Sequence, residues 1–318
     1  MSLRLRLAFE DGTEREIVGQ PWQTVFQSAQ AQGIELATDC REGACATCKA
    51  RCTEGEYDVG DASPEALTDE EEAAGLVLTC QMRPFGDCAL RFPYPFSLTG
   101  GPARRQAALE AVERVAVDTV RFELALDAEL PFLPGQYARI GVPGTGAERA
   151  FSFSRRDRAE FHARLLPDGL MSGYLAARAK PGDRLDLSGP YGGFFLREPA
   201  RPVLMAAGGT GLAPILAMLE ALEGRQPAAV LFGAASEGRL FALDRLAASG
   251  AEVSIAVEEP GGDASFHAGF VTDLIDPPAS DIDAYVCGPP AMIEAARARL
   301  RAAGIAEERI HCERFLPS

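Results

Sequence analysis

Four cysteines have the residue type and spacing of ligands for an iron–sulfur cluster. Cys40, Cys45 and Cys48 form the pattern C-x4-C-x2-C, and Cys80 follows later in the chain. This is the spacing of plant-type [2Fe–2S] sites. A loop that wraps a cluster must also bring its backbone N–H groups close to the sulfurs, which favours small side chains. The loop supplies four of them: Gly43, Ala44, Ala46 and Thr47. The sequence therefore predicts a [2Fe–2S] cluster held by these four cysteines.

Other cysteine chemistries fit this segment less well. A zinc site usually has two C-x2-C pairs, whereas this chain has one and no suitable histidine nearby. A thioredoxin-like C-x-x-C motif would lie at a strand-to-helix turn rather than in such a loop. Cys52 and Cys88 fall outside the spacing, and we interpret both as buried thiols.

A glycine turn in the last third of the chain has the setting of a phosphate site. The residues Gly208, Gly209, Thr210 and Gly211 follow an apolar run and precede a helical segment. Backbone N–H groups at a helix start attract a pyrophosphate, so the turn is a candidate for binding a nicotinamide cofactor. The pattern is not G-x-G-x-x-G, and by itself it also fits a tight turn in an α/β domain.

Two motifs in the middle of the chain have the residue types that a flavin requires. Arg149, Phe151 and Ser152 lie at the start of a predicted strand. Arginine can bind a phosphate, an aromatic ring can stack on a flavin, and serine can hydrogen-bond a flavin nitrogen. The second motif precedes a predicted helix and consists of Gly169, Leu170, Met171 and Ser172. Taken singly, both motifs also fit ordinary strand and turn residues.

Three segments of different character position these motifs. Residues 1–97 contain a hairpin of Leu3–Phe9 and Glu14–Val18 and a helix over residues 25–32, capped by Thr24. Residues 103–198 contain short strands typical of an antiparallel barrel, the first of them at 111–117. Residues 199–318 alternate strands and helices, which predicts a parallel α/β sheet.

Composition and charge exclude several classes of protein. The net charge of −15 disfavours nucleic acid and anionic membrane surfaces as partners. No apolar stretch is long enough to span a membrane, and the N-terminus lacks the apolar core of a signal peptide. We therefore expect a cytoplasmic protein. The acidic excess in residues 1–97 serves either solubility or the docking of a basic redox partner.

The order of these parts resembles the ferredoxin–NADP reductase superfamily. More specifically, it is similar to the reductase component of bacterial aromatic-ring dioxygenases of the benzoate, toluate and anthranilate type. The resemblance covers essentially the whole chain. It depends on the cysteine loop, the Arg149 motif, the Gly208 turn, Cys287-Gly-Pro-Pro290 and the end Glu313-Arg-Phe315. It implies a β-grasp [2Fe–2S] ferredoxin domain at 1–97, an FAD-binding barrel at 103–198 and an NAD(P)H-binding α/β domain at 199–318.

The resemblance also implies roles for individual residues. Arg149, Phe151 and Ser152 would hold the FAD phosphate and ring, and residues 169–172 its pyrophosphate. Gly208–Gly211 would bind the pyrophosphate of the nicotinamide cofactor. Cys287, Gly288 and Pro289 would shape the nicotinamide pocket, with Phe315 near the flavin. Ser152, Cys287 and Phe315 would be the catalytic residues. From the residues alone, Phe315 also fits a core plug and Cys287 a buried thiol.

Three departures from the family pattern affect the predicted sites. Phe151 replaces the usual tyrosine, and Ala46 stands where such loops often have glycine. Arg239 stands where NADH-using members commonly carry an acidic residue. The choice of nicotinamide depends on Ser236, Glu237 and Arg239, which follow a predicted strand. Glu237 suits the free 2′-hydroxyl of NADH, whereas Arg239 suits the 2′-phosphate of NADPH. The resemblance favours NADH.

The predicted activity is electron transfer from NADH through FAD and the [2Fe–2S] cluster to a terminal oxygenase. Two alternatives remain open at this point. The same reductase could serve a diiron monooxygenase or a P450, or the chain could be a redox-sensing module without enzymatic activity. A sensor needs no hydride route, so the nicotinamide and flavin motifs favour the enzyme.

Overall fold

The computed structural model describes residues 2–198, 201–225, 228–276 and 281–315. The chain divides into two compact units, residues 1–102 with 191–193, and residues 103–190 with 194–318. Within the described ranges, no helix is both long enough and apolar enough to cross a membrane. The sequence predicts a domain boundary between residues 198 and 199. This boundary falls at positions 199–200, which lie outside the described residues.

The first unit is built on a five-stranded mixed sheet with the order β2-β1-β7-β3-β5. Its strands are β1 (Leu3–Phe9), β2 (Glu14–Gly19), β3 (Lys49–Glu54), β5 (Leu76–Leu78) and β7 (Cys88–Phe92). β1 pairs antiparallel with β2 and parallel with β7. Alternation along β1 buries Leu3, Leu5 and Leu7 on one face. The predicted hairpin is confirmed.

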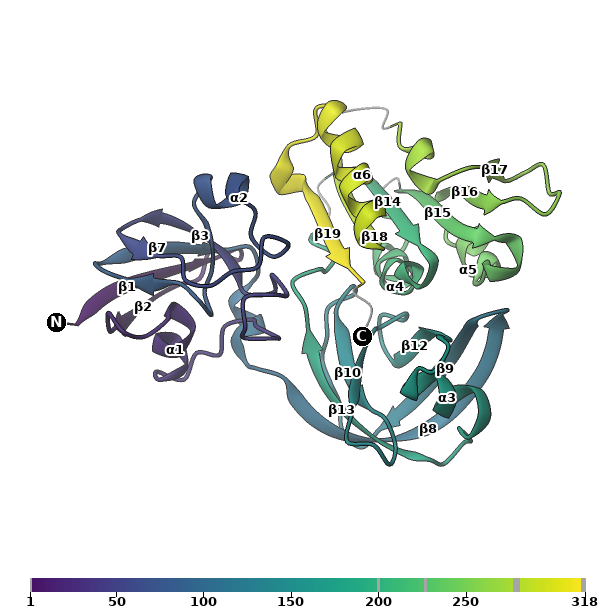
Figure 1. Cartoon of the computed structure of the whole chain (residues 1–318), viewed down its shortest axis with the longest axis horizontal. Helices are drawn as coiled ribbons and strands as arrows, with labels where there is room; N and C mark the ends of the chain where they lie inside the picture. Colours follow the sequence, from purple (N-terminus) through teal and green to yellow (C-terminus); the bar gives the residue numbers. More distant parts are fainter. Residues whose placement is uncertain (1, 199–200, 226–227, 277–280, 316–318) are drawn as a thin grey trace. The chain divides into compact units, whose positions relative to one another are not determined.

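Short elements complete this unit (Figure 1). They are α1 (Val25–Gln30), α2 (Asp69–Ala73), β4 (Tyr57–Asp58), β6 (Arg83–Pro84) and the 3-10 turn η1 (Phe96–Thr99). Thr24 caps α1 as predicted: its hydroxyl accepts from the Gln27 amide at 3.2 Å, and the Gln27 side chain accepts from the Thr24 amide at 3.0 Å. The helix ends at Gln30 rather than at residue 32. The amides of Gln32 and Gly33 bond to carbonyl oxygens three residues back, as in a 3-10 turn, and not four residues back as in an α-helix.

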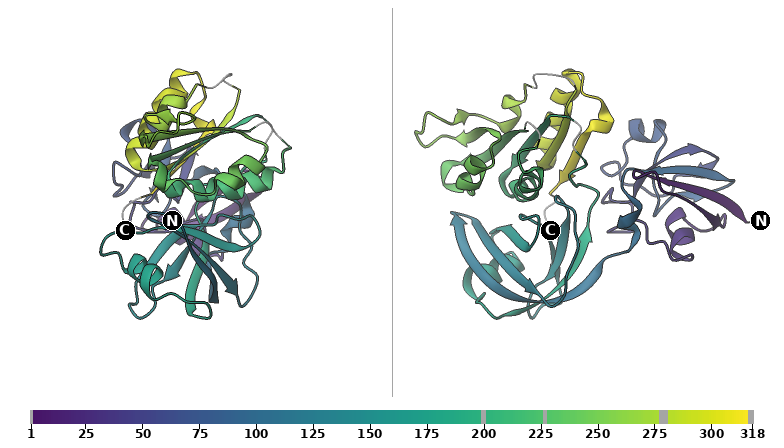
Figure 2. Two further views of the ribbon diagram at one scale, coloured as in Figure 1. Left: turned by 90° about the vertical axis from the view of Figure 1, so that its right-hand side faces the viewer. Right: turned by 180° about the vertical axis from the view of Figure 1, so that it is seen from behind.

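The second unit begins with a six-stranded antiparallel barrel, which confirms the predicted class. The strand order is β11-β10-β13-β8-β9-β12. The strands are β8 (Ala103–Ala116), β9 (Thr119–Leu126), β10 (Tyr137–Gly141), β11 (Glu148–Ser152), β12 (Ala159–Arg164) and β13 (Arg184–Tyr191). A bridge between Phe153 and Phe161 joins the two end strands. Figure 2 shows these strands, coloured from blue to teal, curving into a barrel.

The strand predicted at residues 111–117 is longer than expected. β8 begins at Ala103, directly after Gly100-Gly101-Pro102, because residues 103–108 pair antiparallel with β13. Phe122, Phe153 and Phe161 are fully buried in the barrel core. Helix α3 (Leu170–Ala177) adds Met171 and Tyr174 to that core.

The rest of the second unit is a parallel sheet with the order β17-β16-β15-β14-β18-β19. The strands are β14 (Val203–Gly208), β15 (Ala228–Ser236), β16 (Glu252–Glu259), β17 (His267–Ala268), β18 (Asp283–Gly288) and β19 (Ile310–Arg314). The helices are α4 (Leu212–Leu222), α5 (Leu243–Ala248) and α6 (Pro290–Ala302). The 3-10 turns are η2 (Gly209–Gly211), η3 (Glu237–Arg239), η4 (Val271–Leu274) and η5 (Glu307–Arg309). The predicted parallel sheet is confirmed.

Two apolar cores lie on opposite faces of this sheet. One contains Ile215 and Leu219 of α4 with Leu246 of α5. The other contains Ile293 and Leu300 of α6 (Figure 1). The chain passes from β14 outward through β15, β16 and β17, and then crosses to β18 on the other side of β14. The strand order therefore reverses between β14 and β18, where open α/β sheets bind their ligands.

Candidate functional site

The four predicted cluster ligands lie as two pairs. The backbone amide of Cys40 donates to the Cys45 sulfur at 3.4 Å, and the Cys48 thiol donates to the Cys80 sulfur at 3.2 Å. Among the residues that the structure describes, no group of three or more His, Cys, Asp or Glu side chains suits a single metal ion. The four cysteine sulfurs are the donor set of a [2Fe–2S] cluster.

Strand pairing explains how Cys80 reaches Cys48. Cys48 precedes β3 and Cys80 follows β5, and Lys49 lies opposite Leu78 in the antiparallel pair that these strands form. The amide and the hydroxyl of Thr79 both donate to the carbonyl oxygen of Cys48 at 3.1 Å. The last ligand is therefore fixed by the sheet rather than by the loop.

Hydrogen bonds and neighbouring thiols lower the pKa of two of the sulfurs. Burial raises the pKa of Cys40, but amide bonds from Glu42 and Ala44, both 3.4 Å long, outweigh it and lower that pKa. The thiol of Cys48 lowers the pKa of Cys80 to about 6. The contact with Cys80 raises the pKa of Cys48 in turn, and burial raises the pKa of Cys45. Only Cys40 and Cys80 are therefore biased toward the thiolate form that binds metal.

The loop backbone uses left-handed conformations at three positions. Gly43 has a φ of 75°, and a Cβ there would overlap the carbonyl oxygen of Asp61. Arg41 and Ala46 have φ values of 60° and 59°. Glycine is favoured in this region, which explains why similar loops often have glycine where this chain has Ala46.

The first flavin motif fills a strand rather than only its start. Arg149, Phe151 and Ser152 belong to β11, with Ser152 as its last residue. Successive strand residues face opposite ways, so Arg149 and Phe151 share a face that Ser152 does not. Phe151 packs edge-on against Phe122 at 5.4 Å. The half-buried Arg149 donates to the Glu148 carbonyl at 2.9 Å and has the donor geometry for a phosphate.

The second motif begins helix α3 instead of preceding it. Gly169 is the N-cap residue, and Leu170, Met171 and Ser172 form the first turn. The Met171 side chain is buried in the barrel core, while the Ser172 hydroxyl accepts from the Leu166 amide at 2.8 Å. These side chains are already engaged, so a pyrophosphate would bind here through backbone N–H groups.

The two nicotinamide motifs meet at the point where the strand order reverses. Gly208 ends β14, residues 209–211 form η2, and Gly288 ends β18. A Cβ at Gly211 would overlap the carbonyl oxygen of Cys287, and a Cβ at Gly288 would lie 3.2 Å from the Gly208 amide. The glycines therefore allow the close approach of the two strand ends, and Pro289 follows as the N-cap of α6.

The last strand adds a carboxylate that sequence reasoning missed. Cys287 is fully buried and lies opposite Glu313 in the parallel pair of β18 and β19. The Ser152 hydroxyl donates to the Glu313 carboxylate at 3.5 Å, which links β11 to β19. The Phe315 amide donates to Gly288 at 3.0 Å, and its half-buried ring packs against the core under α4. Glu313 was visible in the terminal segment Glu313-Arg-Phe315, but only the pairing brings it to Ser152.

The three residues considered for nicotinamide choice occupy different settings. Ser236 ends β15. The Glu237 carboxylate accepts from the amides of Gly261 at 2.7 Å and Asp263 at 3.1 Å. Arg239 forms an ion pair with Asp118 in the β8–β9 hairpin at 3.5 Å.

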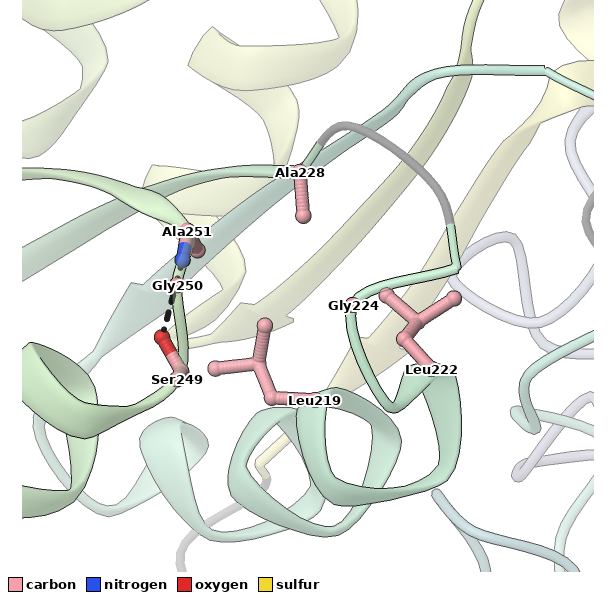
Figure 3. Close-up of a pocket in the computed structure, with 7 residues that line it drawn as sticks. All are labelled: Leu219, Leu222, Gly224, Ala228, Ser249, Gly250 and Ala251. Atoms are coloured by element: carbon pink, nitrogen blue, oxygen red, sulfur yellow. Dashed lines mark hydrogen bonds between the residues drawn. The ribbon is translucent and has the colours of Figure 1, made fainter.

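A hollow in the α/β sheet lies away from these motifs. It is lined by Leu219, Leu222, Gly224, Ala228, Ser249, Gly250 and Ala251 (Figure 3). Ala228 starts β15 and Ala251 precedes β16, so the hollow lies at the amino ends of the strands. The glycine turn follows the carboxyl end of β14, at the opposite edge of the sheet. The hollow contains none of the predicted site residues.

Three family models match the chain in the predicted order. They describe a 2Fe-2S iron-sulfur cluster binding domain at residues 8–85, an oxidoreductase FAD-binding domain at 106–196 and an oxidoreductase NAD-binding domain at 205–298. The chain is accordingly an oxidoreductase with the domains for a [2Fe–2S] cluster, FAD and NAD(H).

Relatives extend the match to the full length. The toluate 1,2-dioxygenase electron transfer component of Pseudomonas putida is 39% identical, over 100% of both chains. The 2-halobenzoate 1,2-dioxygenase electron transfer component of Burkholderia cepacia is 37% identical, over 99% of this chain and 98% of the relative. The solved structure of the Amycolatopsis cytochrome P450 reductase GcoB is 30% identical, with a TM-score of 0.73 over 98% and 99% of the two chains. This chain therefore belongs to the family of oxygenase electron transfer components, which join a [2Fe–2S] domain to FAD-binding and NAD-binding oxidoreductase domains.

Proposed function

We propose that this protein carries electrons from NADH to the oxygenase component of an aromatic-ring-hydroxylating dioxygenase. The observation that carries the proposal is the full-length similarity to the toluate and 2-halobenzoate components. The paired thiols around Cys48 and the meeting of the Gly208 turn with Cys287 support it. We assign the cluster to residues 1–97, FAD to 103–198 and NADH to 199–318.

The chemistry supplied by the bound groups is hydride transfer from NADH to FAD, followed by single-electron transfers through the [2Fe–2S] cluster. The chain's own task is to bind and orient these groups. Cys40, Cys45, Cys48 and Cys80 hold the cluster as thiolates. Arg149 binds the FAD phosphate, and the amides at the start of α3 bind the rest of the pyrophosphate.

At the nicotinamide end, the glycine turn binds the pyrophosphate and the end of β18 forms the wall of the site. Cys287 is buried, which raises the pKa of its thiol and keeps it protonated. Ser152 and Glu313 form a hydroxyl–carboxylate pair that orients the reacting rings. Phe315 lies two positions after Glu313, just beyond the end of β19, and covers the site.

The choice of NADH over NADPH is part of the proposal. The Arg239 guanidinium is paired with the Asp118 carboxylate, so a 2′-phosphate would have to compete with this acid. Glu237 lies two residues earlier and adds a second negative charge. Together these carboxylates disfavour the extra phosphate of NADPH.

The partner is the least constrained part of the proposal, because a P450 reductase is also among the similar structures. The similarity to the two dioxygenase components is higher, and we therefore favour a dioxygenase. The net charge of −15 disfavours nucleic acid and anionic membranes as partners. A cytoplasmic location belongs to the same proposal, because NADH is supplied there.

Reconstitution tests the function directly. The purified protein, loaded with FAD and cluster, should reduce cytochrome c with NADH and support ring dihydroxylation by an added benzoate-type oxygenase. Cytochrome c reduction without support for any dioxygenase, but with support for a P450 or a diiron hydroxylase, would move the assignment to that partner. An absence of NADH-dependent flavin reduction would reject the enzyme and favour a redox sensor.

A further inference from the structure

A buried carboxylate lies where the barrel meets the parallel sheet in the second unit. The Glu160 side chain, on β12, is 2% exposed. It accepts hydrogen bonds from the Ser154 hydroxyl at 2.7 Å, from Arg245 at 2.9 Å and from Arg121 at 3.0 Å. Burial alone would raise the pKa of Glu160, but these partners hold it at about 2. Glu160 is therefore charged at neutral pH.

One guanidinium joins this carboxylate to two other elements. Arg245 comes from α5 and binds Glu160. It also donates to the Ser154 carbonyl at 2.5 Å and to the Glu220 carboxylate on α4 at 2.9 Å. Arg155 donates to the same oxygen of Glu220 at 2.6 Å. The fork of donors on arginine makes such a three-way contact possible, whereas a lysine offers a single point of charge.

The elements joined in this way are those that carry the two proposed cofactor motifs. Ser154 lies two residues beyond Ser152, in the segment that continues β11. Helix α4 begins at Leu212, immediately after the glycine turn of residues 208–211. The network therefore connects the flavin strand to the nicotinamide helix through partly buried contacts, since the side chains of Arg245 and Glu220 are 21% and 28% exposed.

Packing around the network is tight. Ser154 is fully buried, and the buried His162 ring stacks on Phe241 at 4.8 Å. His162 belongs to the barrel and Phe241 to the core under α4. Buried ion pairs contribute little net stability compared with apolar residues of similar volume. Such pairs can instead fix one geometry of the elements that they join.

We propose that Arg245, Glu160 and Glu220 are positioning residues for hydride transfer: they hold helix α4 and its nicotinamide turn in a fixed orientation toward the flavin strand β11. This inference rests on the proposed function, because it concerns the transfer between the two proposed cofactor sites. None of the three residues carries a proposed cofactor contact. They act through the elements that do.

The test is rapid mixing of the FAD-loaded protein with NADH, which separates the limiting rate of flavin reduction from the affinity for NADH. Arg245→Met should lower the limiting rate on the order of tenfold to a hundredfold, because small misplacements of reacting groups are costly. FAD content and the affinity for NADH should stay near the parent values. The isotope effect with deuterated NADH should rise as hydride transfer becomes slower. Arg245→Lys should recover only part of the rate.

Two further variants control the experiment. Arg158→Met removes an exposed arginine that pairs with Asp157 and Glu123 of the barrel, and should keep the parent rate. If Arg245→Met fails to fold or loses FAD, Glu220→Gln provides the test, because it removes the charge on α4 and leaves Glu160 paired. It should slow reduction by about three- to tenfold, again at unchanged affinity.

The outcomes separate the inference from the proposed function. Parent-like limiting rates in Arg245→Met, or in Glu220→Gln if the first variant does not fold, would overturn the positioning role. A change in the affinity for NADH without a change in the limiting rate would also overturn the positioning role. If the unmodified protein is not reduced by NADH at all, the proposed function itself fails.

Discussion

The Ser152 hydroxyl lies 3.5 Å from the Glu313 carboxylate, although 161 positions separate the two residues in the chain. Ser152 ends a barrel strand and Glu313 belongs to the edge strand of the parallel sheet. The contact therefore places a carboxylate from one cofactor-binding half beside a hydroxyl from the other. Neither residue alone identifies this arrangement.

Removing that carboxylate should slow the reaction of NADH with the flavin. The 3.5 Å contact is long for a hydrogen bond, so its main effect is to orient the site, and we expect Glu313→Ala to lower the limiting rate of flavin reduction by about tenfold. FAD should remain bound, because the Arg149 contact is unchanged. Stopped-flow absorbance of the flavin measures both quantities. A rate equal to that of the unmodified protein would show that Glu313 has a structural role and no role in flavin reduction.

Loss of one cluster ligand should remove the [2Fe–2S] cluster without affecting the bound FAD. Cys45→Ser should abolish the [2Fe–2S] absorbance while FAD stays bound, because the ligands and the flavin motifs belong to different compact units. NADH should still bleach the flavin, but electron transfer to cytochrome c should stop. Cys52→Ser is the matched control, since Cys52 is buried outside the ligand set. Normal cytochrome c reduction without a cluster would reject the proposed electron order.

Arg149 should account for much of the FAD affinity. Arg149→Ala removes a charge-assisted phosphate contact of about 1.5–3 kcal/mol, so FAD should bind about ten- to hundredfold more weakly. Equilibrium dialysis gives the affinity directly. Arg105→Ala, which removes a barrel arginine bonded to the Glu129 carbonyl, should leave it unchanged. Equal FAD retention by both variants would mean that another residue anchors the phosphate.

The ion pair between Arg239 and Asp118 should govern the use of NADPH. Asp118→Asn removes the carboxylate that competes with a 2′-phosphate, so kcat/KM for NADPH should rise by about tenfold. The value for NADH should stay near that of the parent. Asp281→Asn is the control, because Asp281 pairs with Arg201 and Arg309 near the amino end of β18. A parent protein that prefers NADPH would make Arg239 its phosphate contact instead.

Acidification should begin to destabilise the second unit near pH 6.5, the pKa of an unperturbed histidine. Burial lowers the pKa of His162 from 6.5 to about 3, so the unfolded chain takes up a proton that the folded chain does not. The free energy of unfolding should therefore fall by about 1.4 kcal/mol per pH unit below pH 6.5 from this group alone. Glu160, whose pKa is held at about 2 against 4.5, adds a further loss below pH 4.5.

Urea denaturation at pH 7, 6 and 5 measures this dependence. His162→Phe keeps a ring against Phe241 and removes the titrating group, so its curve should be flatter between pH 6.5 and 4.5 than that of the parent. The Nδ1 atom of His162 has no hydrogen-bond partner within the described part of the chain, so this substitution removes no bond at that atom. Equal slopes for parent and variant would show that His162 titrates normally.

The local chemistry of this protein can be predicted from its sequence because it depends on short spacings. The ligands Cys40, Cys45 and Cys48 lie in one loop, Thr24 caps its own helix, and the Gly208 turn joins a strand to the helix that follows. Each of these features involves residues that lie within about ten positions of one another, where backbone geometry allows few conformations. The short, closely spaced strands likewise predict the barrel, and the alternation of strands and helices predicts the parallel sheet.

The contacts that complete the site depend on pairing between distant segments, and the tertiary structure alone decides them. Glu313 reaches Ser152 because β19 pairs with β18, and Asp118 reaches Arg239 because a barrel hairpin meets the end of β15. The three-way contact of Arg245 joins α4, α5 and the segment beyond β11. No local pattern specifies such contacts, because the burial of apolar faces determines which elements pack together and sequence distance does not.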